Sequence, residues 1–155
     1  MAEPNHCGTC TLCCKLLDIA VLQKPAYRWC PHCKVGDGCG IYAERPVPCR
    51  EFVCVWLGSQ TGPRPLPAEL RPDRSGMLFY YTNSFKELNG VTDSGRPGAW
   101  RSPKVRSLIR AMAATGRTII FRDGNGHYGV VNGEPRQIEL SEPDEKGART
   151  FVRFL

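Results

Sequence analysis

The segment "CGTCTLCCKLL", residues 7–17, places four cysteines within eight positions. The chain of 155 residues has nine cysteines in all, and the other five lie between residues 30 and 54. An odd number of cysteines leaves one thiol over in any scheme of disulfide pairs. The cysteines therefore indicate a local structural site in the N-terminal third of the chain. We expect what they bind to determine how this part folds.

The composition is that of a globular protein with one domain, or one domain with an appendage. Hydrophobic residues make up 41% and charged residues 23% of the chain. Because no apolar run is longer than a few residues, we expect no membrane-spanning helix. The N-terminal residues do not show the basic and apolar regions of a secretory signal. We therefore expect a cytoplasmic location, where thiols stay reduced and clustered cysteines more often indicate metal binding than disulfides.

Two arrangements of the cysteines predict two kinds of metal site. Two C-x2-C pairs, Cys7/Cys10 and Cys30/Cys33, are separated by 19 residues, which matches a zinc ribbon. A second metal would then draw on Cys13 or Cys14, Cys39, Cys49 and Cys54. In the other arrangement, C-x2-C-x2-C from Cys7 to Cys13 suits three corners of a [4Fe–4S] cluster. The residues alone leave open zinc or iron, and one site or two.

The Cys13–Cys14 doublet bears on the number of sites. Neighbouring side chains of an extended segment point in opposite directions. We therefore expect the two thiols to serve different centres, or one of them to stay unligated. His6 and His32 flank cysteines, but thiols are in surplus and we do not expect either histidine to be a ligand.

Residues other than the cysteines complete the expected module. Arg45 and Arg50 either offset the negative charge of the thiolates or make ordinary surface contacts. We expect a small apolar wall beside the metal, formed by Ile41, Tyr42, Phe52, Val53, Trp56 and Leu57.

The sequence predicts three parts: a cysteine-rich metal-binding module (1–58), a proline-rich connector (59–76) and an α+β extension (77–155). Prolines exclude a regular helix or central strand from the connector, which we expect to run extended over the surface. In the extension, "MLFYYT" (77–82) predicts a strand. Ser102-Pro103 predicts the start of a helix, with an apolar stripe of Val105, Leu108, Ile109 and Met112.

Turn residues divide the rest of the extension. We expect a turn-rich stretch over residues 83–100 and two or three short strands over 117–140, with tight turns at Asp123-Gly124 and Asn132-Gly133. His127 lies in one of these hairpins and is expected at the surface. The fold class is therefore α+β, with a small, loop-rich, metal-stabilised cysteine module followed by a short strand–helix–hairpin extension.

Three motifs in this order resemble the YkgJ-type cysteine-cluster family, a zinc- or iron-chelating domain named for its CxxCxxCC signature. They are "CGTCTLCC", "GCGIYAERPVPCREFVC" and "LRPDR", and the resemblance covers roughly residues 5–82. It implies the metal ligands Cys7, Cys10, Cys13, Cys14, Cys30, Cys39, Cys49 and Cys54, with Cys33 as an addition to the shared set. The related domain of flagellin lysine N-methylase is associated with an iron–sulfur cluster, but we do not expect methylase activity here.

We therefore expect a cysteine-ligated metal-binding protein that holds zinc, or iron as an iron–sulfur cluster, in one or two sites. The metal is expected to be at least partly structural. The alternatives are an iron–sulfur redox or radical enzyme subunit, and a metal trafficking or storage protein. A non-enzymatic role is favoured because no motif of a catalytic site is present. The net charge of +6 permits an acidic protein partner, whereas nothing in the charge pattern favours nucleic acid.

Overall fold

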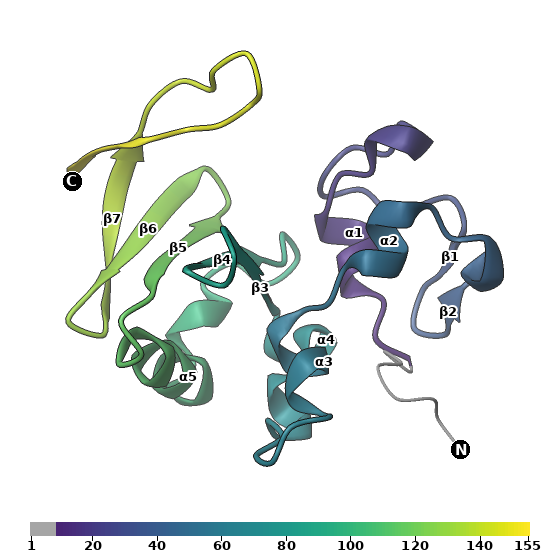
Figure 1. Ribbon diagram of the computed structural model, residues 1–155, viewed down its shortest axis with the longest axis horizontal. Coiled ribbons are helices and arrows are strands. Elements are labelled where there is room, and N and C mark those ends of the chain that lie inside the picture. Colours follow the sequence, from purple (N-terminus) through teal and green to yellow (C-terminus); the bar gives the residue numbers. More distant parts are fainter. Residues whose placement is uncertain (1–8) are drawn as a thin grey trace.

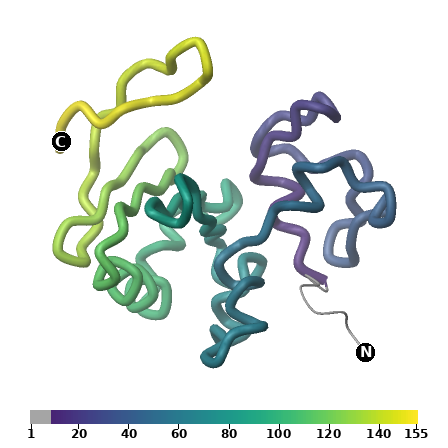
Figure 2. Tube along the Cα trace, in the orientation of Figure 1, coloured from purple at the N-terminus to yellow at the C-terminus, as the bar shows by residue number. Residues whose placement is uncertain are grey.

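The computed structural model describes residues 9–155, which form two adjoining parts (Figure 1). The N-terminal part consists of short helices and a small hairpin, and the C-terminal part is a six-stranded sheet with the longest helix. Figure 2 shows the first part in purple and blue on the right, and the second in green and yellow on the left. The fold is mixed α+β, as expected. Two residues named above, His6 and Cys7, lie outside the described residues.

The N-terminal part contains only short elements. Its α-helices are α1 (Leu12–Leu16), α2 (Val47–Glu51), α3 (Val55–Ser59) and α4 (Pro72–Ser75), and it has three 3₁₀ turns, Ala20–Leu22, Tyr42–Glu44 and Ala68–Leu70. The strands β1 (Cys33–Lys34) and β2 (Gly38–Cys39) pair in an antiparallel hairpin. Helices of four or five residues are not stable on their own. This part of the chain therefore depends on what its side chains contact.

The C-terminal part is one sheet whose strands follow the order of the sequence. They are β3 (Met77–Thr82), β4 (Glu87–Thr92), β5 (Thr118–Asp123), β6 (Gly126–Val131), β7 (Glu134–Leu140) and β8 (Phe151–Phe154). All neighbours are antiparallel except β4 and β5. A parallel pair needs a crossover connection, and this one carries the 3₁₀ turn Ala99–Arg101 and the helix α5 (Pro103–Ala113).

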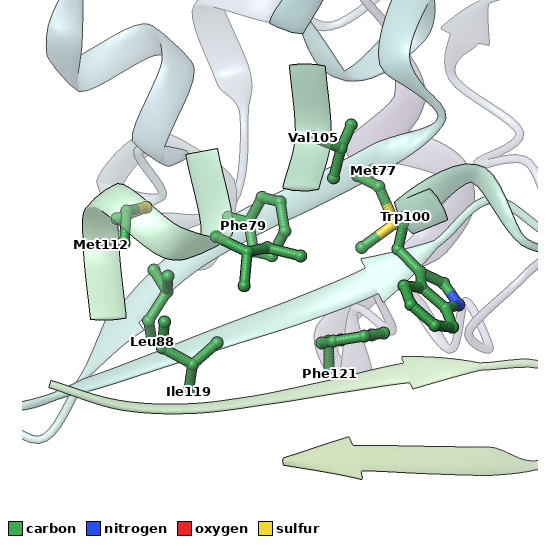
Figure 3. Close-up of a cluster of buried hydrophobic side chains, with 9 residues drawn as sticks. Met77, Phe79, Leu88, Trp100, Val105, Met112, Ile119 and Phe121 are labelled. Atoms are coloured by element: carbon green, nitrogen blue, oxygen red, sulfur yellow. The ribbon is translucent and has the colours of Figure 1, made fainter. Parts of the chain in front are cut away.

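The main hydrophobic core lies between α5 and the sheet (Figure 3). The helix begins where the sequence predicts, because the Ser102 hydroxyl accepts a hydrogen bond from the Val105 amide at 3.4 Å. Its apolar stripe faces the sheet, although Leu108 is only partly buried. The buried members of this core are Met77, Phe79, Leu88, Trp100, Val105, Ile109, Met112, Ile119 and Phe121.

Strand β3 joins the two parts, because successive side chains of a strand point to opposite faces. Met77 and Phe79 enter the core beneath α5, whereas Leu78 between them belongs to a second buried cluster. The other members of that cluster come from α1, α3 and the residue before α3, and they are Leu12, Leu16, Cys54 and Leu57. An ion pair of 2.6 Å between Lys15 and Asp93 connects α1 to the residue after β4. The cysteine module is thus docked on the sheet by apolar contacts and one ion pair.

Several predicted elements are confirmed. The strand over 77–82 and the helix that follows Ser102 are present. Asn132 and Gly133 form the tight turn between β6 and β7, both with positive φ, 51° and 78°. No helix within residues 9–155 combines the length and the apolar character needed to cross a bilayer.

Two expectations about local structure were wrong. Residues 87–92, expected within a turn-rich stretch, form the strand β4. Its alternation was hidden because two of its buried positions are Gly90 and Thr92. The proline-rich connector contains the helix α4, which is allowed because Pro72 occupies the first helical turn, where a helix needs no amide donor.

Gly90 provides a test of the sheet packing. A Cβ at this position would lie 2.7 Å from the Phe121 Cβ and 2.7 Å from the Phe79 ring. We therefore expect Gly90→Ala to lower the free energy of unfolding in urea by roughly 1–3 kcal/mol, the usual cost of overpacking. The control is Gly95→Ala, whose Cβ would lie 3.6 Å from its nearest neighbour and should change that energy by less than about 1 kcal/mol. Equal effects of the two substitutions would contradict this account of the core.

Candidate metal centre

All cysteines among residues 9–155 line one cavity of about 730 Å³. They come from segments that are well separated along the chain, and none of those in the described region is in a disulfide. Cys10 lies before α1, and Cys13 and Cys14 lie within it. Cys30 lies before β1, and Cys33 is in β1. Cys39 is in β2, Cys49 in α2, and Cys54 directly before α3. The structure therefore gathers in space the thiols that the sequence places in short clusters.

The Cys13–Cys14 doublet lies inside α1, so the expectation of an extended segment was wrong. The helix begins with a hydrogen bond of 3.0 Å from the Cys14 amide to the Thr11 carbonyl. Both side chains line the cavity, and the Cys13 thiol lowers the pKa of Cys14. The doublet therefore presents two thiols to the same cavity.

The hairpin segment is tied to α1 by two backbone contacts. The Cys30 amide donates to the Cys14 carbonyl at 3.0 Å, and the Gly36 amide donates to the Thr11 hydroxyl at 3.1 Å. A further bond of 3.0 Å, from the Cys33 amide to the Cys30 carbonyl, closes the turn between these two cysteines. Cys33 and Cys14 therefore line the same cavity.

The remaining thiols approach from two further places. Cys49 is on α2 and interacts electrostatically with Cys14, Cys30 and Cys39. Cys54 is buried at the N-cap of α3, where its sulfur accepts a hydrogen bond from the Leu57 amide at 3.4 Å. It interacts electrostatically with Cys10, which is hydrogen-bonded to the carboxylate of Asp73. The cysteines thus form a larger set around Cys14 and a smaller set beside Asp73.

The thiols of Cys14 and Cys33 differ most in their acidity. Hydrogen bonds from the Cys13 and Cys33 thiols, helped by the charge of Lys24, lower the pKa of Cys14 to about 6 against the opposing effect of burial. Burial and the neighbouring Cys14 thiolate raise the pKa of Cys33 to about 12. At neutral pH Cys14 is therefore the thiolate of this pair, and a thiolate is the form that binds metal.

Burial also raises the pKa of the thiols of Cys10, Cys49 and Cys54. At Cys49 the charge of Arg45 opposes this rise. This matches the first of the two roles expected for Arg45, which was to offset the charge of thiolates. The Arg45 guanidinium also lies 3.8 Å from the centre of the Tyr42 ring. Charge brought to these buried thiols by deprotonation requires nearby cations, a metal ion among them.

Lys24 is a buried residue near the thiols that the sequence analysis missed. Lys24 is only 3% exposed. Its amino group donates hydrogen bonds to the carbonyl of Lys15, at 2.8 Å, and to the carbonyl of Leu17. A tight turn through Gln23, with φ of 53°, folds it back to pair with Ile19. Burial lowers the pKa of Lys24, while the thiols of Cys30 and Cys14 favour its charged form. No motif surrounds this lysine, so only its place in the fold identifies it.

Other candidates named from the sequence contribute less. Arg50 and His32 are exposed, and His127 is half-buried on β6, where burial lowers its pKa. Of the expected apolar wall, Leu57 is buried and Phe52 and Trp56 pack against the same cluster, whereas Tyr42 and Val53 are exposed. The aspartate of "LRPDR" was also missed: burial raises the pKa of Asp73, but Arg71, 2.6 Å away, outweighs burial and lowers it.

In the described region, no three His, Cys, Asp or Glu side chains form a ready-made metal site. The thiols surround the cavity without converging on one point. The donor set itself fits a thiophilic metal, since it consists of reduced thiols with a buried ammonium group beside them. No model of a known protein family matches the chain, and neither a curated protein nor a solved structure matches it.

The buried lysine gives a test of this arrangement. Lys24→Met keeps the aliphatic stem but leaves the carbonyls of Lys15 and Leu17 without their donor. We expect the free energy of unfolding in urea to fall by roughly 1–3 kcal/mol, the cost of unsatisfied buried polar groups. In the same module Lys34 is exposed, so the control Lys34→Met should change this energy by less than about 0.5 kcal/mol. An unchanged stability of Lys24→Met would mean that the ammonium group is not part of the buried structure.

Proposed function

We propose that residues 9–58, together with Cys7, form a metal-binding module that holds zinc, or iron as an iron–sulfur cluster, through cysteine thiolates. The observation that supports this most is that eight cysteines, none of them in a disulfide, line one cavity. Cysteines that only fill a core bury their sulfurs in apolar surroundings. Here the Cys13 and Cys33 thiols and the charge of the buried Lys24 all lower the pKa of Cys14.

The proposed ligands fall into the two sets of cysteines described above, the larger around Cys14 and the smaller beside Asp73. Cys14, Cys30, Cys39 and Cys49 belong to the larger set, which Cys33 also joins through its contact with Cys14. Cys10 and Cys54 belong to the smaller set, and Cys13 packs against the apolar cluster that contains Cys54 while donating to Cys14. This division supports two centres, with the Cys13–Cys14 doublet between them.

The proposed role of the metal is at least partly structural. The module has no helix longer than five residues between Thr9 and Gln60, and its one hairpin has strands of two residues. Such elements do not hold a fold by themselves. Bound metal can supply on the order of 10 kcal/mol of folding free energy to a small cysteine-rich module at neutral pH. Reduced thiols agree with the proposed cytoplasmic location.

The resemblance to the YkgJ-type family remains part of this proposal. Residues of two of the quoted stretches act on the thiols: Arg71 and Asp73 of "LRPDR" pair near Cys10, and the charge of Arg45 in "GCGIYAERPVPCREFVC" lowers the pKa of Cys49. No other observation of the described residues favours an enzyme or a metal carrier over a structural metal protein. None points to a particular partner.

Metal content tests the proposal directly. The full chain, expressed with iron and purified without oxygen, should contain one or two metal ions or one iron–sulfur cluster per chain, measured by elemental analysis and visible absorption. Cys14→Ser and Cys49→Ser should each lower the metal content at least about twofold, because each removes a thiolate. Asp37 lines the same cavity, and the control Asp37→Asn should keep its metal. Wild-type protein that is free of zinc and iron would refute the proposal.

A structural role predicts a local response to metal removal. After complete chelation, hydrogen–deuterium exchange should accelerate across residues 18–53, where only short elements occur. Amides of β5, β6 and β7 should keep their protection, since their core does not include the thiols. Unchanged protection of residues 18–53 in metal-free protein would show that the metal does not hold the fold.

A further inference from the structure

Arg71 ties the first cysteine-bearing segment to a distant part of the chain. Its Nη2 atom donates a hydrogen bond of 3.1 Å to the hydroxyl of Thr9, which lies 62 positions earlier in the sequence. Thr9 directly precedes Cys10, and Cys10 lies before the N-cap of α1, where the hydrogen bonds of that helix do not hold it. The contact with Arg71 therefore restrains a cysteine that lies outside any helix or strand.

The guanidinium group of Arg71 is itself held in one orientation. It binds the carboxylate of Asp73 with two hydrogen bonds, from Nε to Oδ1 and from Nη2 to Oδ2, each 2.6 Å long. The Arg71 side chain is only 18% exposed. Such a paired geometry requires the planar fork of arginine, which lysine cannot reproduce. The group that meets Thr9 is thus aligned by a second, stronger contact.

The short helix α4 that carries this pair is fixed by contacts that include no thiol. The carbonyl of Arg71 accepts hydrogen bonds of 2.9 Å from the amides of Arg74 and Ser75. From the loop after β4, the Arg96 Nη1 atom donates to the carbonyl of Arg74 at 2.6 Å. Pro72 is buried and lines the same cavity as the cysteines. Arg71 is therefore positioned by the part of the chain that leads into the sheet.

We propose that Arg71 is a positioning residue of the metal site, which holds the Cys10 segment against α4 through its hydrogen bond to Thr9. The inference rests on the proposed function, because the role of Cys10 as a ligand is part of that function. Arg71 itself binds no metal. Residues that orient metal ligands typically change metal affinity about 10- to 100-fold when they are replaced. The Cys10 side of the cavity is accordingly in place before metal binds.

The first test changes only the hydrogen-bond acceptor. The full chain is freed of metal, kept reduced and titrated without oxygen with cobalt(II), and its Kd is measured by competition with a chelator. Thr9→Val removes the hydroxyl from an exposed residue and should raise the Kd about three- to tenfold, the effect of one lost hydrogen bond. The control Thr9→Ser keeps the acceptor and should leave the Kd within about twofold of wild type.

A second pair of variants tests the arginine. Arg71→Lys keeps the charge but loses the fork, and it should raise the Kd at least about tenfold. It should also weaken the sulfur-to-cobalt absorption per bound ion, because Cys10 no longer reaches the metal. A merely structural role would lower the amount of bound cobalt without changing this absorption per ion. The control Arg74→Lys, at an exposed position of the same helix, should leave both quantities unchanged.

Labelling of the metal-free protein examines the segment without any metal. In Arg71→Lys, N-ethylmaleimide should modify Cys10 at least about threefold faster than in wild type, because the reactivity of a thiol follows its exposure. Equal labelling rates, or an unchanged Kd in both Thr9→Val and Arg71→Lys, would overturn the inference. Wild-type protein that binds no cobalt while the labelling difference persists would instead refute the proposed function and leave the contact of Arg71 with the segment standing.

Discussion

Crowding of thiols around one cavity is the constraint on which the N-terminal half depends. Thiolates brought this close repel one another unless protons, cations or metal ions neutralise them. The protein supplies two such neutralising effects, hydrogen bonds between thiols at Cys14 and the buried ammonium group of Lys24. A metal ion is the group that would satisfy the remaining charge and also connect segments too short to fold separately.

The sheet supports the cysteine module through buried apolar contacts. Strand β3 presents alternate residues to two cores, with Phe79 beneath α5 and Leu78 against α1 and α3. The second core also contains Cys54, so one ligand candidate is anchored in apolar packing that continues into the sheet. Two parts of the chain therefore share one strand, which contributes alternate residues to the hydrophobic cluster of each.

The sequence was sufficient where a local rule decides the structure. The cap at Ser102, the alternation of residues 77–82 and the Asn132-Gly133 turn each follow from nearby residues, and each is present. Long-range contacts decided the failures. Gly90 is buried because two phenylalanines close over it, and α1 is helical although its cysteines suggested an extended loop. The set of thiols was foreseeable from spacing, but the burial of Lys24 near them depends on how distant segments meet.

The most direct measurement of the central claim is X-ray absorption spectroscopy at the zinc or iron edge of protein purified without oxygen. Thiolate ligation predicts a first shell of sulfur, at about 2.3 Å for zinc, or the sulfur and iron shells of a cluster. The spectrum should change when Cys14 or Cys49 is replaced by serine. A first shell of nitrogen and oxygen at about 2.0–2.1 Å, unchanged in those variants, would contradict the account.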